Sequence, residues 1–190
     1  EMREMPLQYK TTLTLLRNIV SIGWPSTSVA RSRVIKEHAK EREQDGEGDM
    51  ISSGSFTIVN PQFREGAFMN DGEARVPLGN QLFPILVTAI FELEHALSRD
   101  DLGNERPTSS HCAVNRNAQF TPHVDSGRGA GQSLSMIVGL GDYNGGKIKI
   151  EGDAHDIRYI PLEFDGWKQR HWTAPFMGER FSLVWFTPDM

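Results

Sequence analysis

The stretch ERFSLVWFT, residues 179–187, alternates between two kinds of side chain. Successive side chains of an extended strand point to opposite faces, so the bulky apolar Phe181 and Leu183 share one face while Arg180 and Ser182 share the other. The apolar face suits packing against a layer of helices. The opposite face directs a guanidinium into the protein, which is costly unless an anionic group meets it. The stretch therefore predicts a two-faced strand with either an acidic ligand or a buried acid beside Arg180.

The rest of the sequence from residue 111 onward also has a strand-like pattern. Short apolar or alternating runs are separated by turn clusters such as SGRGAG, GDYNGG and FDG. The runs are HCAVN, QFTPHVD, SLSMIVGL, KIKIEG and RYIPLEF. Several short strands joined by regular turns are typical of a β-sandwich, jelly roll or barrel.

The first part of the chain has a different pattern. Apolar periodicity predicts a helix over residues 7–22, ended by Gly23, and a second helix over about residues 82–98. Residues 31–50 are a dense charge run, which we interpret as a solvated helix and loop without a functional role. Residues 60–80 have the composition of a long surface loop.

Length and pattern together indicate one domain of the α+β class. A chain of 190 residues can bury a sizeable core of its own. Within it we expect residues 1–110 to be a helical and loop region that buttresses a β core formed by residues 111–190.

Composition excludes several classes of protein. Cys112 is the only cysteine, which excludes an intrachain disulfide framework and a cysteine-based zinc site and predicts an intracellular location, cytoplasmic or nuclear. No apolar run approaches the roughly 20 residues needed to cross a bilayer. The net charge of −5 does not favour a nucleic-acid binder, although it is compatible with a local basic groove. The oligomeric state cannot be inferred from the sequence.

A second motif, FTPHVDSG at residues 120–127, carries a candidate pair of metal ligands. His123 and Asp125 stand at i and i+2, so on a strand they point the same way and can bind one metal. Two histidines and one carboxylate are the ligand set of non-haem Fe(II) oxygenases. The third ligand must come from another strand. His171, between a turn and a strong strand, is a better candidate than His155, which lies among turn-forming acids.

The ordered set of HVD, then His171, then Arg180 with Ser182 resembles the pattern of the Fe(II)/2-oxoglutarate-dependent dioxygenase superfamily. That pattern is an H-x-D pair, a distal histidine some tens of residues later and an Arg-x-Ser shortly after it. The resemblance covers about residues 112–187, and YNGGKIKIEG resembles the Gly-Gly hairpin between the two ligand segments. The compact core is also similar to the TET and J-base-binding protein branch of the superfamily.

The resemblance implies a fold and a set of site residues. The fold is a double-stranded β-helix, a jelly-roll architecture, with the N-terminal helices packed on its major sheet. The implied Fe(II) ligands are His123, Asp125 and His171. The implied cosubstrate residues are Arg180 and Ser182, which would bind the distal carboxylate of 2-oxoglutarate.

Asn115, on the strand before the first ligand, is a further candidate contact of 2-oxoglutarate, with Asn117 as its alternative. The implied reaction uses O₂ and 2-oxoglutarate, hydroxylates or oxidises a C–H bond of the substrate, and gives succinate and CO₂. The expected substrate is a protein side chain or a small metabolite that the sequence does not identify. A dependence on ascorbate is left open.

Three other functions remain open from the sequence. The first is oxidation of methylated pyrimidine bases in nucleic acid, against which the acidic balance argues. The second is a non-catalytic, cupin-like metal-binding module. The third is a zinc hydrolase built on the same three ligands, which leaves Arg180 without a purpose. If the chain is an oxygenase, we expect the SGRGAG segment at residues 126–131 to lie at the entrance for the substrate.

Overall fold

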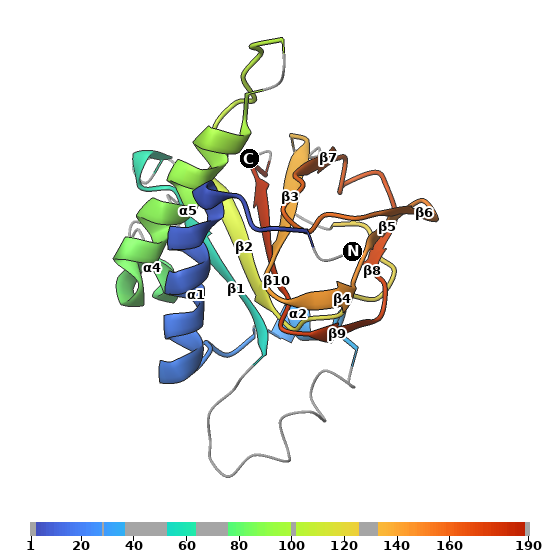
Figure 1. Cartoon of the computed structure of the whole chain (residues 1–190), viewed down its shortest axis with the longest axis horizontal. Helices are drawn as coiled ribbons and strands as arrows, with labels where there is room; N and C mark the ends of the chain where they lie inside the picture. Colours follow the sequence, from blue (N-terminus) through green and yellow to red (C-terminus); the bar gives the residue numbers. More distant parts are fainter. Residues whose placement is uncertain are drawn as a thin grey trace.

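A five-stranded antiparallel sheet lies at the centre of the protein (Figure 1). The structure is a computed structural model, and it describes residues 3–27, 29–36, 53–63, 76–99, 102–125 and 133–188. The helical elements are η1 (Leu7–Tyr9), α1 (Lys10–Ile22), α2 (Val29–Ser32), η2 (Pro61–Phe63), α4 (Leu78–Leu82) and α5 (Pro84–Leu97). The strands are β1 (Gly54–Val59), β2 (His111–Arg116), β3 (Ser135–Leu140), β4 (Tyr143–Gly145), β5 (Ile148–Ile150), β6 (Asp153–His155), β7 (Leu162–Phe164), β8 (His171–Thr173), β9 (Phe176–Gly178) and β10 (Phe181–Phe186).

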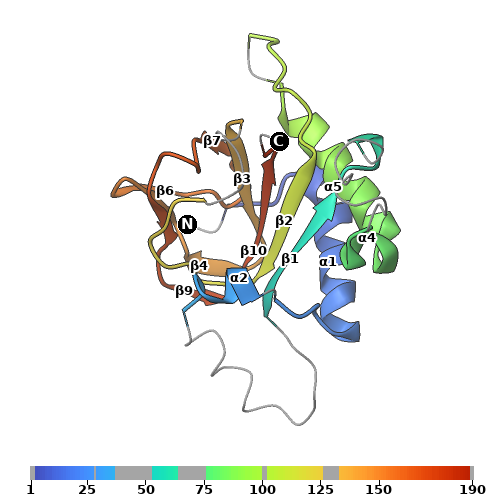
Figure 2. The ribbon, with the colours of Figure 1, turned by 180° about the vertical axis from the view of Figure 1, so that it is seen from behind.

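The strands form one large and two small sheets. The large sheet has the order β1-β2-β10-β3-β7, and every neighbouring pair in it is antiparallel. The small sheets are β4-β9 and β6-β5-β8. Figures 1 and 2, which view the molecule from opposite sides, show the helices α1, α4 and α5 on one side of the large sheet and the small strands on the other. The protein thus combines helices with antiparallel sheets, which agrees with the α+β class predicted from the sequence.

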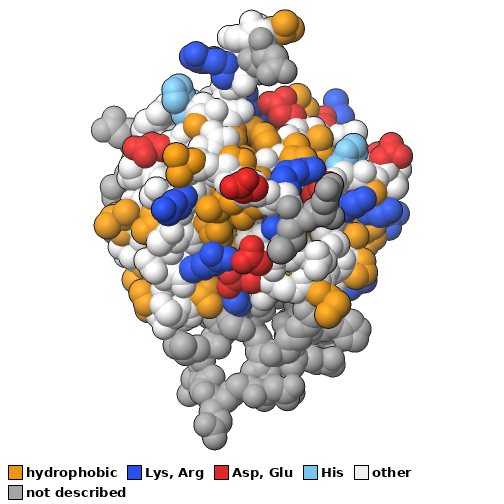
Figure 3. All heavy atoms as spheres, in the orientation of Figure 1, with side chains coloured by type: hydrophobic (Ala, Val, Ile, Leu, Met, Phe, Trp, Pro, Cys, Tyr) orange, Lys and Arg blue, Asp and Glu red, His pale blue; other side chains and the backbone are white. Residues whose placement is uncertain are grey.

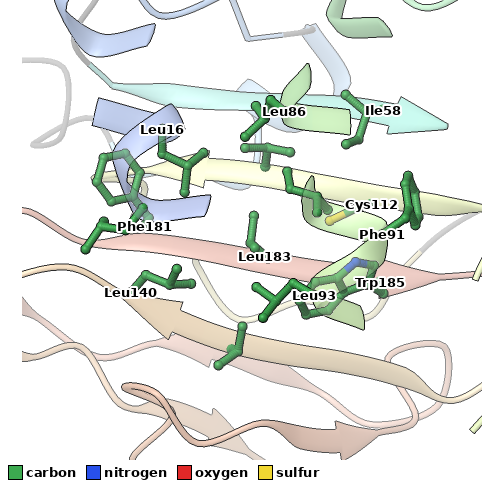
Figure 4. Close-up of a cluster of buried hydrophobic side chains, with 14 of the residues drawn as sticks. Leu16, Ile58, Leu86, Phe91, Leu93, Cys112, Leu140, Phe181, Leu183 and Trp185 are labelled. Carbon is green, nitrogen blue, oxygen red and sulfur yellow. The ribbon is translucent and has the colours of Figure 1, made fainter. Parts of the chain in front are cut away.

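The helix-facing side of the large sheet carries the main hydrophobic core (Figure 4). Phe181, Leu183 and Trp185 of β10 belong to this core and are fully buried. They pack with Leu16 of α1 and Ile90 of α5. The predicted apolar face of β10 is therefore confirmed, because period-two alternation sends these side chains to one layer.

Both predicted helices are present, with boundaries set by local residues. The first comprises η1 and α1, and it ends where Gly23 takes a positive φ of 129° and its N–H bonds to the carbonyl of Ile19. The second begins at Pro84, a residue whose fixed φ suits the first position of a helix, so the residues before it form the separate helix α4.

The opposite side of the large sheet packs on the three-stranded sheet through a second, smaller apolar cluster. Its buried members include Ile137 of β3 and Phe164 of β7, which lie with Ile148 and Ile150 of β5, and Val184 of β10 packs against them. The interior between the two sheets therefore has an apolar lining. The candidate site residues lie around this interior.

The expected Gly-Gly hairpin at YNGGKIKIEG is wrong. β4 pairs with β9, whereas β5 pairs with β6 and β8, so the two strands belong to different sheets. Gly145 and Gly146 both have positive φ, at 76° and 67°, and they carry the chain across from one sheet to the other.

A buried carboxylate ties the end of α5 to the loop before β2. Glu94 is 1% exposed, and both of its oxygens accept the backbone N–H of Ser109, at 3.0 and 3.2 Å. Arg106 lies 3.7 Å away and also bonds to the carbonyls of Leu134 and Trp185. Burial raises the pKa of Glu94, although its hydrogen bonds and Arg106 oppose the shift.

This raised pKa predicts a pH-dependent stability. The folded protein holds the Glu94 proton more tightly than the unfolded chain does, so the free energy of unfolding falls as pH rises from the unfolded pKa of about 4.3 through the folded value. Glu94→Gln removes the titration. The stability of the wild type relative to this variant, measured by urea denaturation, should therefore decrease with rising pH. A difference that grows with pH would contradict this, and Glu92→Gln at an exposed position of the same helix is the control.

On the face drawn in Figure 3, acidic and basic side chains are interspersed and form no large patch of one charge. Within the described parts of the chain, no helix is both long enough and apolar enough to span a bilayer.

Candidate metal centre and cosubstrate pocket

Backbone pairing brings the two candidate histidine ligands together. His123 and His171 exchange backbone hydrogen bonds of 3.1 and 2.9 Å across an isolated antiparallel bridge. Directly opposed residues of an antiparallel pair project their side chains to the same face, and the centroids of the two rings are 4.4 Å apart. Asp125 follows two residues later, and its N–H bonds to the carbonyl of Gly166 at 2.8 Å. Three side chains from two segments thus meet on one face.

Hydrogen bonds to the backbone orient both rings. The Nδ1 atom of His123 lies 2.6 Å from the carbonyl of Thr121, and that of His171 lies 2.9 Å from the carbonyl of Gln169. A carbonyl can only accept, so each Nδ1 carries the proton and each Nε2 keeps its lone pair. The two Nε2 atoms face Oδ1 of Asp125 at 3.7 and 3.4 Å.

The donor set fits a divalent transition metal. His123, Asp125 and His171 each offer one ligand atom, and these atoms all lie within 4.8 Å of one another. Two neutral imidazoles and one carboxylate on one side of an ion match the facial arrangement of non-haem iron sites. The Nδ1–carbonyl hydrogen bonds are the outer interactions that orient such ligands.

The electrostatic environment differs between the two histidines. Burial lowers the pKa of His123, and its hydrogen bond to Thr121 only partly offsets this. Burial also lowers the pKa of His171, but the interaction with Asp125 and the hydrogen bond to Gln169 outweigh it, so this pKa is raised. The carboxylate therefore interacts more strongly with His171 than with His123.

Arg180 lies in a closed pocket formed by Gly146, at the crossover between the two small sheets, and by two aromatic rings. It is 2% exposed, and its Nε and Nη2 atoms donate to the carbonyl of Gly146 at 3.2 and 3.1 Å. Its guanidinium carbon lies 5.6 Å from the ring centroids of both Tyr143 and Phe176. A Cβ on Gly146 would stand 2.8 Å from Nε, so this pocket needs glycine at the crossover.

Salt bridging to a buried acid was the alternative explanation for Arg180. No carboxylate of the described residues lies within 4.0 Å of its guanidinium, and burial lowers the pKa of this group. Asn117 holds the backbone of Arg180 through two hydrogen bonds. The side-chain oxygen of Asn117 accepts the backbone N–H of Arg180 at 2.9 Å, and the backbone N–H of Asn117 donates to the carbonyl of Arg180 at 2.8 Å. Asn117 thus positions the chain at Arg180.

Ser182 and Asn115 face the inner side of the large sheet as cross-strand partners. They are paired in the register of β10 and β2, and the amide nitrogen of Asn115 donates to the Ser182 hydroxyl at 3.1 Å. Both are 2% exposed, and the side-chain oxygen of Asn115 has no partner among the described residues. This pair therefore leaves one buried acceptor open to a ligand.

Tyr143 is a pocket residue that our sequence reasoning did not single out. Its hydroxyl is buried without a hydrogen-bond partner in the described structure, and burial raises its pKa. The hydroxyl occupies the space in front of Gly139, which is the cross-strand partner of Ser182. A glycine inside an apolar strand marks a close approach, so Gly139 in SLSMIVGL was the available signal.

Because a Cβ at position 139 would overlap this hydroxyl, Gly139→Ala is expected to destabilise the protein by about 1–3 kcal/mol. Tyr143→Phe removes the overlapping atom. The double variant should therefore recover most of the loss, which chemical denaturation of the four proteins would measure. Equal costs of Gly139→Ala in both backgrounds would show that the hydroxyl does not occupy this space.

The metal-ligand cluster and the Arg180 pocket face the same interior but are separate clusters. His171 packs edge-on against the ring of Phe164, with centroids 4.9 Å apart. Phe164 belongs to the inner apolar cluster with Ile137 and Val184, the latter on the same strand as Ser182. No polar contact among the described residues joins the two clusters, so a ligand that engages both must cross this apolar lining.

The charge run at residues 31–50 contains a residue that our sequence interpretation placed wrongly. Arg31 is half-buried, and its Nη1 donates to the Ser55 hydroxyl of β1 at 2.9 Å. Ser55 is the cross-strand partner of Asn115, so Arg31 reaches the inner side of the large sheet. Residues 37–50 of the run and the SGRGAG segment lie outside the described residues.

Three comparisons relate the chain to known proteins. No protein-family model matches it, and no curated protein sequence matches it either. Among solved structures, it is similar to NgTET1 in complex with 5mC DNA, at 14% identity and a TM-score of 0.45 over 80% of this chain and 67% of that chain. It is also similar to a prolyl-4-hydroxylase of Pseudomonas putida, at 17% identity and a TM-score of 0.37 over 94% of this chain and 100% of that chain. A third similar structure is OsALKBH1, at 13% identity and a TM-score of 0.41 over 94% and 91% of the two chains.

The three structures named above are Fe(II)/2-oxoglutarate oxygenases.

Proposed function

We propose that this chain is a non-haem Fe(II)/2-oxoglutarate-dependent dioxygenase. In this proposal His123, Asp125 and His171 bind the iron, while Arg180 and Ser182 bind the distal carboxylate of 2-oxoglutarate. The enzyme hydroxylates or oxidises a C–H bond of a protein side chain or a small metabolite, and it gives succinate and CO₂.

One observation carries the proposal. Two imidazoles with their Nε2 lone pairs turned toward Asp125 share an interior with a fully buried arginine that no described carboxylate meets. The three donors form a set that binds a divalent metal. The buried guanidinium needs an anionic partner to offset its desolvation, and the carboxylate of a ligand would supply it. A zinc hydrolase would use the donors but would leave Arg180 without an anion.

The proposed architecture is a double-stranded β-helix. Residues 111–190 form its core, and residues 1–110 buttress it with helices on the outside of the large sheet and with β1 as an edge strand. Support comes from the two sheets that pack face to face through one apolar cluster, and from the helical core on the outer face.

Each residue group has a distinct task in this proposal. The iron and 2-oxoglutarate supply the oxidative chemistry when bound, while the protein supplies orientation and exclusion of water. His123, Asp125 and His171 would hold the iron, as a ligand set of the kind that leaves coordination positions open for a cosubstrate and O₂. Arg180 and Ser182 fix the distal end of the cosubstrate, and the Tyr143 hydroxyl and the Asn115 amide are further polar groups at that end.

Anaerobic addition of Fe(II) and 2-oxoglutarate tests the proposal directly. We expect a visible metal-to-ligand charge-transfer band that depends on both additions. A screen of peptides, small metabolites and methylated DNA for stimulated succinate release would then identify the substrate class. A band without turnover on any substrate class would favour a binding module, whereas no band would contradict the oxygenase.

A further inference from the structure

Tyr143 is in contact with two guanidinium groups. Its ring centroid lies 5.6 Å from the guanidinium carbon of Arg180 and 5.7 Å from that of Arg158. Arg158 also donates from Nη1 to the backbone carbonyl of Tyr143 at 3.1 Å. It therefore contacts Tyr143 through both the ring and the main chain. Arg180 is the proposed partner of the distal carboxylate, whereas Arg158 has no role assigned in the proposed function.

The hydroxyl of Tyr143 is a buried polar group without a hydrogen-bond partner among the described residues. It lies in front of Gly139, and Gly139 is the cross-strand partner of Ser182. The hydroxyl, the Ser182 side chain and the Arg180 guanidinium are therefore neighbours in the proposed cosubstrate pocket. A buried hydroxyl in this position needs an acceptor, and the carboxylate that Arg180 would bind supplies one.

The backbone around Arg158 is anchored to the same glycine. Gly139 donates its N–H to the carbonyl of Ile157 and accepts the N–H of Tyr159, each at 2.8 Å, across an isolated parallel bridge to Arg158. Ile157 is buried in the inner apolar cluster, and Tyr159 is buried in the main core. Tyr159 also has a positive φ of 56°, a conformation that persists only where the surrounding structure imposes it. Arg158 is therefore held between two fixed neighbours.

The side chain of Arg158 has few polar contacts apart from Tyr143. It is 12% exposed, and its Nε is buried without a hydrogen-bond partner among the described residues. The carboxylate of Asp142 lies 4.0 Å from Nη2 and is 76% exposed, and Arg17 lies closer to it, at 3.3 Å. An exposed ion pair of this kind contributes little to stability. The Tyr143 carbonyl is therefore the main polar partner of this guanidinium.

We propose that Arg158 is a positioning residue of the cosubstrate pocket, which holds Tyr143 so that its hydroxyl donates to the carboxylate bound by Arg180. The inference rests on the proposed function, and it adds a residue that acts through Tyr143 and does not itself touch the cosubstrate. The hydrogen bond to the Tyr143 carbonyl fixes the main chain, and the guanidinium lies against the ring.

The charge of Arg158 has a second effect on Tyr143. Burial raises the pKa of the phenol, and the charges of Arg180 and Arg158 oppose this shift. A phenol whose proton is less tightly held is a stronger hydrogen-bond donor to a carboxylate. Loss of the Arg158 charge should therefore weaken the bond from the hydroxyl to the cosubstrate even where the ring keeps its place.

Two other roles for Arg158 make different predictions. If Arg158 served only to pair with Asp142, Asp142→Asn would have the same effect as loss of the arginine. If Arg158 only anchored residues 157–159, its loss would lower the stability of the protein. The change in 2-oxoglutarate affinity would then be the same with and without the Tyr143 hydroxyl.

The first test is a double-mutant cycle on the dissociation constant of 2-oxoglutarate, measured by the charge-transfer band of protein loaded anaerobically with Fe(II). Tyr143→Phe should raise this constant about 10-fold or more, as expected for a lost hydrogen bond to a charged group. Arg158→Met should raise it about 3- to 10-fold, because the bond is weakened and not lost. In the Tyr143→Phe background, Arg158→Met should change it less than about 2-fold.

Two results of this cycle would overturn the proposal. The first is an equal effect of Arg158→Met with and without the Tyr143 hydroxyl, and the second is an effect of Asp142→Asn as large as that of Arg158→Met. Fe(II) affinity should be unchanged in every variant and serves as the check on folding. Arg158→Lys, which keeps a cation but not the planar fork, should be intermediate, and it replaces Arg158→Met if that variant does not fold.

The second test needs no metal. The chain has three tyrosines, so protein labelled with fluorotyrosine should give three fluorine NMR resonances, and Tyr143→Phe identifies the one from Tyr143. Addition of 2-oxoglutarate to the metal-free wild type should shift this resonance, and Arg158→Met should need about 3- to 10-fold more ligand for the same shift. No shift in the wild type, or equal titrations of the two proteins, would contradict the role of Arg158. A missing charge-transfer band with an intact shift would instead mark a failure of the oxygenase proposal.

Discussion

Replacing His171 with alanine is expected to abolish Fe(II) binding at this site and, with it, all turnover of 2-oxoglutarate. The substitution removes one of three donor atoms. Loss of an outer partner of a metal ligand already costs about 10- to 100-fold in affinity, so loss of the ligand itself should exceed about 100-fold. Anaerobic Fe(II) titration, followed by the charge-transfer band with 2-oxoglutarate, measures both losses.

A matched histidine makes this result specific. His155→Ala, at a half-exposed position of β6 outside the cluster, should leave the titration unchanged. Because His171 packs on Phe164, alanine there also removes apolar contact, so Asp125→Ala at the more exposed ligand serves as a second variant. Iron binding that survives Asp125→Ala, or that is lost in His155→Ala, would rule out this ligand set.

Arg180→Met is the second substitution with a large expected effect. It keeps the approximate shape of the side chain and removes its charge, so the distal carboxylate loses its cationic partner. The dissociation constant of 2-oxoglutarate should rise about 100-fold or more, since truncating one partner of a buried charge pair costs about 2–5 kcal/mol. Iron affinity should stay within a few-fold of the wild type, because Arg180 makes no contact with the three ligands.

The stability of this variant gives an independent check. Without a ligand, Arg180 is a buried charge that no described carboxylate meets, and replacing such a charge by an apolar side chain is often neutral or stabilising. The metal-free Arg180→Met protein should therefore be at least as stable as the wild type, and Arg180→Lys should bind 2-oxoglutarate with intermediate affinity. Wild-type affinity for 2-oxoglutarate in Arg180→Met would exclude the proposed pocket, and Arg170→Met at an exposed position is the control.

The sequence predicted the features that depend on local alternation. The two faces of β10 follow from the order of Arg180, Phe181, Ser182 and Leu183, because every second side chain of a strand shares a face. The common direction of His123 and Asp125 follows from the same rule. The helices were predictable for a similar reason, since their apolar period lies within a single stretch of chain.

Features that depend on register between distant strands were not predictable. The approach of the Tyr143 hydroxyl to Gly139 was missed at shorter range, because it depends on how the chain turns between β3 and β4, and only the glycine in SLSMIVGL signalled it. The Gly-Gly segment was misinterpreted for the same reason, since two adjacent glycines permit a hairpin and a crossover equally well. Only strand pairing distinguishes the two.

The inward position of Arg31 was missed for a different reason. It begins a run in which charged residues dominate, and composition averaged over that run indicates a solvated segment. Its direction depends on the pairing of residues 34–36 with residues 119–121, a contact between segments far apart in sequence. A single residue that reaches inward is not detectable in the average of its neighbours.

The position of β10 has a consequence for how the protein folds. β10 is the last strand of the described chain, and it lies between β2 and β3. Until it is in place, β2 and β3 each present an unpaired edge that can pair with another chain. The sheet also requires contacts of long sequence separation, which slow folding and prolong that exposure. Expression should therefore be sensitive to chaperones and to temperature, more than the modest size of the chain would indicate.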